Sequence, residues 1–296
     1  MESVEFLHNQ LNNLNELRNI VKTMKALSAA SIRQYEQAVI AVTSYYQTVE
    51  RGLHIVLKDM ESPSAAALDT RAPKRHAAIV FGSDHGLCGK FNEEISQHAL
   101  NYEALTKVQP ENRFVLAIGA RVAASLENEG QVIKENFMVP NSAAQITATV
   151  EKILVKIDEW DQQSGVHYVY LFYNRHSGKR YHPTGVELLP IDLKRFLSLQ
   201  EERWPSRSLP TFTMNRDALF SRLLHQYLFV SIFRACAESQ ASEHASRLAA
   251  MQSAQRNLDD RVEEVTMSFH RARQNVITSE LLDLASGFEA ITNPKT

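Results

Sequence analysis

Two long stretches of the chain carry a helical repeat of apolar residues and no helix breaker. Neither glycine nor proline occurs in residues 1–51 or in residues 211–286. In the first stretch, apolar residues recur at steps of three and four, at Leu7, Leu11, Leu14, Leu17, Val21, Met24 and Leu27. In the second, the same spacing runs through Ala237, Ala241, Ala245, Leu248 and Met251, and then through Leu258, Val262, Val265, Phe269, Ala272 and Val276. Stripes this narrow predict the helices of a coiled coil.

The segment between these stretches has a different pattern. Short apolar runs predict strands at 76–82, 113–119, 131–139 and 166–173, with an edge strand at 181–191. Helical patterns lie between them at 91–105, 121–128 and 143–160, the last preceded by Asn141 and Ser142 as expected caps. Strands that alternate with helices indicate a mostly parallel sheet. Residues 192–213, with two prolines, are predicted to form the loop that returns the chain to the final helix.

The fold class that follows is α/β, with a long antiparallel coiled coil of the N- and C-terminal helices plus a Rossmann-like α/β domain. We expect the first helix at 1–60, the domain at 70–192 and the second helix at 211–288. A helix of the second length is too long to bury its stripe on a small domain, so the first helix is its expected partner.

Composition narrows the classes of function. The 296 residues include 32 Lys and Arg against 34 Asp and Glu, and this net charge of −2 gives no reason to expect nucleic-acid binding. The two cysteines, Cys88 and Cys236, lie far apart and do not suggest a disulfide framework. The N-terminal residues do not resemble a secretory signal or transit peptide, and no apolar run is long enough to span a bilayer. Any membrane association is therefore expected to be indirect, through a partner.

The stretch FGSDHGLCGK at residues 81–90 has the residue types of an active site. A phosphate-binding P-loop needs a glycine where Asp84 stands and a hydroxyl where Phe91 stands. The glycine spacing also fails the dinucleotide-binding pattern. Ser83, Asp84 and His85 are consecutive, whereas a catalytic triad is assembled in space.

A metal site is not supported either, because His85 and Cys88 have no second pair of ligands at metal-binding spacing. We therefore predict no catalytic residue, cofactor or metal site. The expected structure is a strand-to-helix turn with Cys88 buried and Asp84 bonded to local amides. The basic residues at 174–180 are interpreted as a solvated hairpin. The polar residues near the C-terminus, Arg271, Arg273, Gln274, Thr278 and Glu280, fit either a helix end inside a partner's cavity or a solvated helix face.

Four segments resemble the gamma subunit of F-type ATP synthases, the central rotor shaft. They are VKTMKALSAAS at 21–31, GSDHGLCGKFN at 82–92, ASEHASRLAAM at 241–251 and RQNVITSE at 273–280. Their order and spacing cover nearly the whole chain.

The resemblance implies a shaft that performs no bond chemistry and transmits torque. It implies that the coiled coil lies inside an alpha3beta3 hexamer and that the α/β domain contacts an epsilon subunit and the c-ring of the membrane sector. Ion flow through the c-ring would then be coupled to ATP synthesis or hydrolysis at the beta subunits. The implied location is peripheral, on the cytoplasmic face of a bacterial inner membrane.

The resemblance also implies roles for individual residues. Contacts with the beta subunit are expected at Met24, Lys25, Arg273, Gln274, Thr278 and Glu280. The signature of the turn in the α/β domain comprises Asp84, Gly86, Leu87, Cys88 and Gly89.

The chain departs from the family at several positions, which indicates a divergent member, and the absence of a visible transit peptide favours a bacterial one. His85 and Lys90 stand where the family usually has arginine and glycine, and residues 17–20 replace a polar run. The coupling ion, H⁺ or Na⁺, and the direction of the reaction stay open. A Rossmann-like nucleotide-binding enzyme with helical extensions is the alternative function, and a purely structural coiled-coil scaffold is a third.

Overall fold

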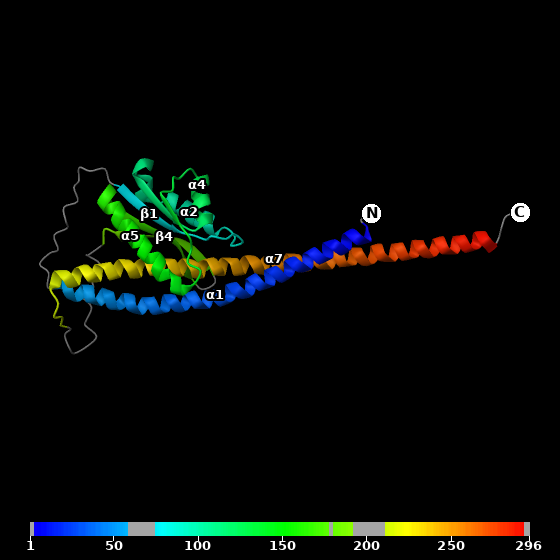
Figure 1. Cartoon of the computed structure of the whole chain (residues 1–296), viewed down its shortest axis with the longest axis horizontal. Coiled ribbons are helices and arrows are strands. Elements are labelled where there is room, and N and C mark those ends of the chain that lie inside the picture. The colour runs from blue at the N-terminus through cyan, green and yellow to red at the C-terminus, as the bar shows by residue number, and fades with distance from the viewer. Residues whose placement is uncertain (1–2, 59–74, 178–179, 192–210, 293–296) are drawn as a thin grey trace. The chain divides into compact units, whose positions relative to one another are not determined.

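The computed structural model describes residues 3–58, 75–177, 180–191 and 211–292 (Figure 1). The predicted return loop at 192–213 therefore lies mostly outside the described residues. Within the described part of the chain, no helix is both long enough and apolar enough to cross a lipid bilayer.

The chain divides into two compact units. Unit 1 consists of Met1–Leu27 with Leu248–Thr296, and unit 2 consists of Ser28–Arg247. Two long helices, α1 (Val4–Lys58) and α7 (Arg216–Thr292), contribute residues to both units. These helices are the two that the absence of glycine and proline predicts.

Unit 2 contains a five-stranded sheet in the order β3-β2-β1-β4-β5. Its strands are β1 (Arg75–Phe81), β2 (Arg113–Ile118), β3 (Glu135–Phe137), β4 (Val166–Ser177) and β5 (Arg180–Leu189). β1 pairs in parallel with β2 and β4, β2 pairs in parallel with β3, and only β5 runs antiparallel to its neighbour. The mostly parallel sheet flanked by two long terminal helices confirms the predicted fold class.

Helices cover both faces of this sheet. The helices after α1 are α2 (Phe91–Leu100), α3 (Glu103–Thr106), α4 (Ala120–Asn128) and α5 (Ile146–Ser164), with short 3₁₀ turns η1 (Pro110–Asn112) and η2 (Ala143–Gln145). Alternate residues of a strand point to opposite faces, so Ile79 of β1 lies in a first core and Val80 in a second. The first core is built with α5 and with the unit 2 parts of α1 and α7, and the second with α2, α3 and α4.

Small residues bring α7 close to this first core. Ala237 and Ala241 are buried there beside Tyr35 of α1. The helices run antiparallel in unit 2, because Tyr35 faces His244 whereas the later Tyr45 bonds the earlier Gln226. The predicted antiparallel pairing is confirmed in this unit.

Unit 1 contains the other ends of the same two helices. His8 faces Phe269 and Arg18 pairs with Asp259, so ten residues forward on α1 correspond to ten residues back on α7. Three predicted stripe residues, Leu17, Leu27 and Val276, are instead 50%, 63% and 46% exposed. A seven-residue repeat that starts at Leu7 places the later contact residues at 14, 21 and 28, so Leu27 lies one position off the line of contact.

Three local predictions are also wrong in detail. The helix predicted at 91–105 breaks after Leu100, since Tyr102 is extended and its ring packs on Tyr170 and Phe172 in the second core. The strand predicted at 131–139 pairs only over Glu135–Phe137. Ser142 makes no side-chain cap of the next helix.

Candidate functional site at the 82–92 turn

The 82–92 turn starts directly after β1, at the carboxyl end of a parallel strand, and ends in the first residues of α2. The strand order changes direction beside β1, since β2 lies on one side and β4 on the other. In doubly wound sheets, the crevice at such a switch point is the usual ligand site. The contacts of this turn therefore decide whether the domain binds a ligand there.

Two glycines let the 82–92 turn pack directly on the β2–α4 connection. A Cβ atom on Gly82 would lie 2.3 Å from the Cβ of Val122. Gly119 has φ +121°, and a Cβ on it would lie 2.7 Å from the carbonyl oxygen of Ser83. These glycines thus allow two segments of the same chain to pack closely against each other. A phosphate-binding loop would instead leave its backbone open at this place.

Asp84 is the residue that ties the turn to neighbouring loops. Its Oδ1 accepts a hydrogen bond from the Ala120 N–H and its Oδ2 accepts one from the Val139 N–H, both at 2.9 Å. We expected bonds to amides within the turn, but the donors belong to two other segments. Both carboxylate oxygens are therefore engaged in holding the ends of β2 and β3 beside β1.

The potential nucleophiles of the turn are also engaged. Ser83 Oγ donates to the His85 carbonyl and accepts from Asn92 Nδ2, both at 2.9 Å. Cys88 is buried as predicted, and burial raises the pKa of its thiol, which disfavours the reactive thiolate. Across the described residues, no group of three or more His, Cys, Asp or Glu side chains is placed to hold a metal ion.

Side chains of helix α7 bond the backbone of the turn. Ser246 Oγ donates to the Cys88 carbonyl at 2.5 Å, and Arg247 Nη2 donates to the carbonyls of His85 at 3.3 Å and Gly86 at 3.4 Å. The backbone acceptors of the turn are thus satisfied by side chains of a helix more than 150 residues away in the sequence.

The same face of α7 reaches the end of β4. Ser242 Oγ donates to the Asn174 carbonyl at 2.8 Å. Asn174 in turn donates through Nδ2 to the Phe91 carbonyl at 3.1 Å, which closes the path from β4 back to the start of α2. We call Ser242, Glu243, Ser246 and Arg247 the α7 junction.

A buried ion pair lies inside the α7 junction. Arg247 Nη2 lies 2.7 Å from Glu243 Oε1, and the two side chains are 8% and 7% exposed. Gln240 Nε2 donates to the second carboxylate oxygen at 3.1 Å. Burial raises the pKa of Glu243, and the charge of Arg247 opposes that shift. The pair orients Arg247 toward the turn.

A second polar contact joins β4 to α7, where the sequence predicted a solvated hairpin. Arg175 lies 3.2 Å from Glu238 and donates to the Tyr173 hydroxyl at 2.7 Å, while Arg234 also bonds Glu238. The solvated-hairpin interpretation is wrong for Asn174 and Arg175, because these residues bond Ser242 and Glu238 of the distant helix.

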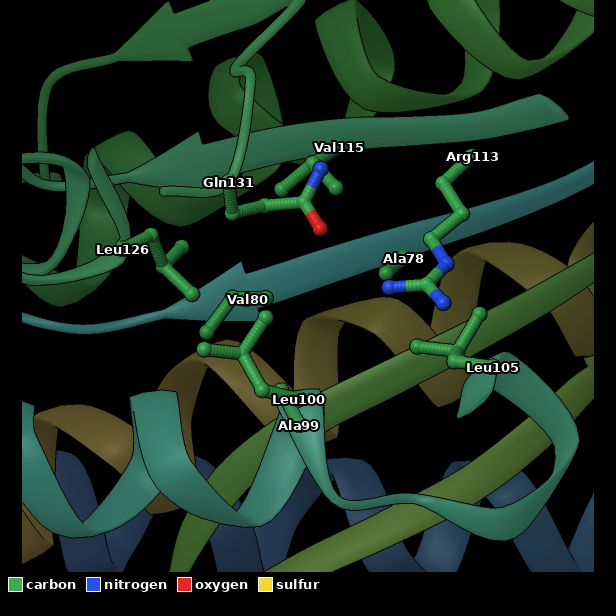
Figure 2. A pocket seen from close by; sticks show the side chains of 9 residues that line it. All are labelled: Ala78, Val80, Ala99, Leu100, Leu105, Arg113, Val115, Leu126 and Gln131. Atoms are coloured by element: carbon green, nitrogen blue, oxygen red, sulfur yellow. The ribbon is translucent and has the colours of Figure 1, made fainter. Parts of the chain in front are cut away.

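A small cavity lies on the other face of the sheet, in the second core. Its volume is about 10 Å³, room for a single water molecule, and apolar residues form most of its lining. Figure 2 shows the guanidinium of Arg113 and the amide of Gln131 on either side of it. Arg113 Nε already donates to the Val108 carbonyl and Gln131 Nε2 to the Val132 carbonyl. This cavity is far too small for a nucleotide.

The residues expected to contact a beta subunit lie in unit 1. Lys25 Nζ donates to Gln255 Oε1 at 3.1 Å. The preceding residue, Met24, is half-buried. The residues expected on α7 are all exposed, and they are Arg273, Gln274, Thr278 and Glu280. Thr278 Oγ1 bonds the Gln274 carbonyl within the helix at 2.8 Å. Their role in contacting a beta subunit stays a prediction.

Sequence reasoning placed the turn correctly and missed the α7 junction. Gly86, Leu87 and Gly89 lie in the turn as expected, and Leu87 is exposed with φ +63°. The apolar stripe runs unbroken through Ala241 and Ala245, so no local pattern signals that the polar residues between and after them, Ser242, Glu243, Ser246 and Arg247, are buried.

Known proteins of one family are similar to this chain over nearly its whole length. A family model described as ATP synthase matches residues 3–291. The ATP synthase gamma chain of Geobacter metallireducens is 29% identical over 273 residues, covering 89% of this chain and 90% of the relative. The ATP synthase gamma chain of an Anaeromyxobacter species is 28% identical over 299 residues, covering 98% of this chain and all of the relative.

Solved structures show the same fold. A chain of the rotor of the Euglena gracilis mitochondrial ATP synthase superposes with a TM-score of 0.61 at 16% identity, over 93% of this chain and 98% of that chain. A chain from the OSCP, F1 and c-ring structure of the same enzyme gives a TM-score of 0.64 at 16% identity, over 99% and 96%.

Proposed function

Since this chain belongs to the ATP synthase family, we propose that it acts as the gamma subunit of an F-type complex, the rotating central shaft. In this role the chain performs no bond chemistry itself. It couples ion flow through a c-ring to ATP synthesis or hydrolysis at the beta subunits. We retain the division into a helix at 1–60, an α/β domain at 70–192 and a helix at 211–288 as part of this proposal.

The α7 junction is the observation that supports this function best. A shaft must pass torque from the α/β domain to the long helix without slip. The contacts of Ser242, Ser246 and Arg247 are directional hydrogen bonds to the backbone of the turn and of β4. Directional bonds resist a sliding or rolling displacement, whereas apolar contacts alone are tolerant of it.

The same observation disfavours the alternative nucleotide-binding enzyme. That enzyme would need backbone amides or side chains open at the switch point of the sheet. Here the Asp84 carboxylate already accepts from the Ala120 and Val139 amides, and the Arg247 guanidinium lies against the turn, where it donates to the His85 carbonyl. A pure scaffold would not require a buried ion pair between Glu243 and Arg247 directed at a turn.

The proposed partners follow from the family. The helices of unit 1 would lie inside an alpha3beta3 hexamer, with beta-subunit contacts at Met24, Lys25, Arg273, Gln274, Thr278 and Glu280. Several apolar residues in the same part of α7 are exposed and would contact an apolar inner surface of that hexamer. They include Val276, Ile277, Leu281 and Leu284. The α/β domain would contact the c-ring and an epsilon subunit. The complex would place this chain at the cytoplasmic face of a bacterial inner membrane.

Reconstitution tests the proposal directly. We expect the tagged full chain to capture a purified, untagged alpha3beta3 assembly, and ATP hydrolysis to rotate a bead attached to the α/β domain. The double variant Arg273→Ala/Gln274→Ala should slow this rotation, whereas Arg222→Ala, another exposed arginine of α7, should not. A well-folded chain that recovers no alpha3beta3 assembly would refute the rotor function.

A further inference from the structure

Tyr35 joins three parts of unit 2 that are far apart in the sequence. It lies on α1 and is only 2% exposed. Its hydroxyl donates to the Pro140 carbonyl at 3.2 Å, on the segment that leads from β3 to η2 and α5. Its ring stacks on His244 of α7, with ring centroids 5.6 Å apart and an interplanar angle of 15°. One side chain therefore contacts both long helices and the α/β domain.

The residue after Tyr35 makes a second contact with the α/β domain. Glu36 Oε1 lies 3.5 Å from His176 Nε2 near the end of β4. One turn further along α1, Ala38 and Val39 pack against the first core. Residues 35–39 of α1 thus contact the domain at several points, and Tyr35 contributes a buried hydrogen bond there.

The chemistry of Tyr35 and His244 suits a fixed, uncharged contact. Burial raises the pKa of Tyr35 to about 12, so its hydroxyl stays a donor at any physiological pH. Burial lowers the pKa of His244 to about 4, so the stacked imidazole is neutral. The hydrogen bond from a buried hydroxyl to a carbonyl is directional. The stacked pair of rings sets the spacing between α1 and α7.

We infer that Tyr35 is a positioning residue that fixes α1 to the α/β domain, in the way that Arg247 fixes α7. The inference rests on the proposed function in one respect: the fixed attachment makes both helices rotate together with the domain. Tyr45 provides the contrast. Its hydroxyl bonds Gln226 at 2.9 Å on the exposed surface and so joins the two helices without reaching the domain.

Spin labels on the free full chain test the attachment. Ile40 of α1 and Val155 of α5 are exposed, so a label on a cysteine at each site reports the distance between α1 and the domain. Tyr35→Phe keeps the ring and removes the hydrogen bond, and we expect the population of displaced distances to rise about fivefold. Tyr35→Leu also removes the stack and should broaden the distribution further. Tyr45→Phe is the matched control and should leave it unchanged.

Rotation of the reconstituted complex then tests the functional part. With the bead on the α/β domain, Tyr35→Leu should lower the number of rotations per ATP hydrolysed. Tyr35→Phe, which keeps the ring, should lower this number much less. Distance distributions in both Tyr35 variants that match the unsubstituted chain would overturn the inference, whatever the rotation assay gives. Broadened distributions with unchanged coupling would overturn its rotor part. Failure of the unsubstituted chain to rotate would refute the proposed function and leave the distance result intact.

Discussion

The buried pair in the α7 junction allows a sharp test of how the domain is held. Arg247→Met removes the guanidinium and keeps most of the side-chain volume. The change deletes the contact with Glu243 at 2.7 Å and the hydrogen bonds to the carbonyls of His85 and Gly86. Among the residues that the structure describes, Glu243 then stays buried with Gln240 as its remaining hydrogen-bond partner. Breaking a buried pair in this way costs about 3–5 kcal/mol of unfolding free energy, because an uncompensated charge is left inside.

The pH dependence of that cost gives a second, independent test. Burial already raises the pKa of Glu243, and Arg247 opposes the shift, so Arg247→Met should raise the pKa further. A carboxyl whose folded pKa lies above its unfolded pKa binds more protons when folded. Its stabilising contribution is complete below the unfolded pKa and is lost as pH rises through the folded pKa. The cost of Arg247→Met should therefore be large at pH 8 and shrink toward pH 5.

Urea unfolding followed by the fluorescence of Trp160, which lies in the first core, measures this cost. A Trp204→Phe background removes the second tryptophan. The matched control is Arg261→Met, since Arg261 pairs with Glu264 on the exposed surface of the same helix and should contribute less than about 1 kcal/mol. If Arg247→Met costs no more than the control, or if its cost does not fall on acidification, the α7 junction is not a buried electrostatic contact.

Three further changes probe the turn and its surroundings. Gly82→Ala should destabilise the chain by about 1–3 kcal/mol in the same urea assay through overpacking against Val122, and Val122→Ala should not relieve this loss, because alanine keeps the Cβ that lies nearest. Asp84→Asn should cost about 1–3 kcal/mol and speed the hydrogen exchange of the two amides that its carboxylate accepts. Burial raises the pKa of Cys236 to about 12 and also raises that of Cys88, so neither thiol should react with a disulfide reagent at pH 8 until urea unfolds the chain.

The parts of the fold that the sequence predicts are those with local causes. The two long helices follow from the absence of glycine and proline and from the apolar repeat, both of which act within a few turns of the chain. The central strands are short apolar runs bounded by breakers, and β1, β2 and β4 lie where those runs predict them. The 82–92 turn is predicted for the same reason, since its glycines mark the end of a buried run.

The errors share a different cause, which is contact with distant residues. The helix after the turn ends at Leu100 because Tyr102 packs on β4, roughly 70 residues later, and no local pattern encodes that. The local sequence predicts that Arg175 belongs to a solvated hairpin, whereas in the structure it bonds Glu238 of α7. Leu17 fits a helical stripe by spacing alone, but the observed line of contact brings its neighbour Arg18 toward Asp259.

The α7 junction shows why residues that resemble an active site can serve a structural role. Parallel strands end in backbone groups that need polar partners, and a ligand supplies them in many doubly wound domains. In this chain Ser246 and Arg247 donate to carbonyls of the turn and Asp84 accepts from two neighbouring amides, so side chains of the chain itself satisfy these groups and attach a helix. The polarity of the turn at 82–92 is then an adaptation to a partner within the chain. That adaptation predicts that apolar replacements at Ser242, Ser246 or Arg247 will loosen the helix without creating a ligand site, because Asp84 still holds the neighbouring amides.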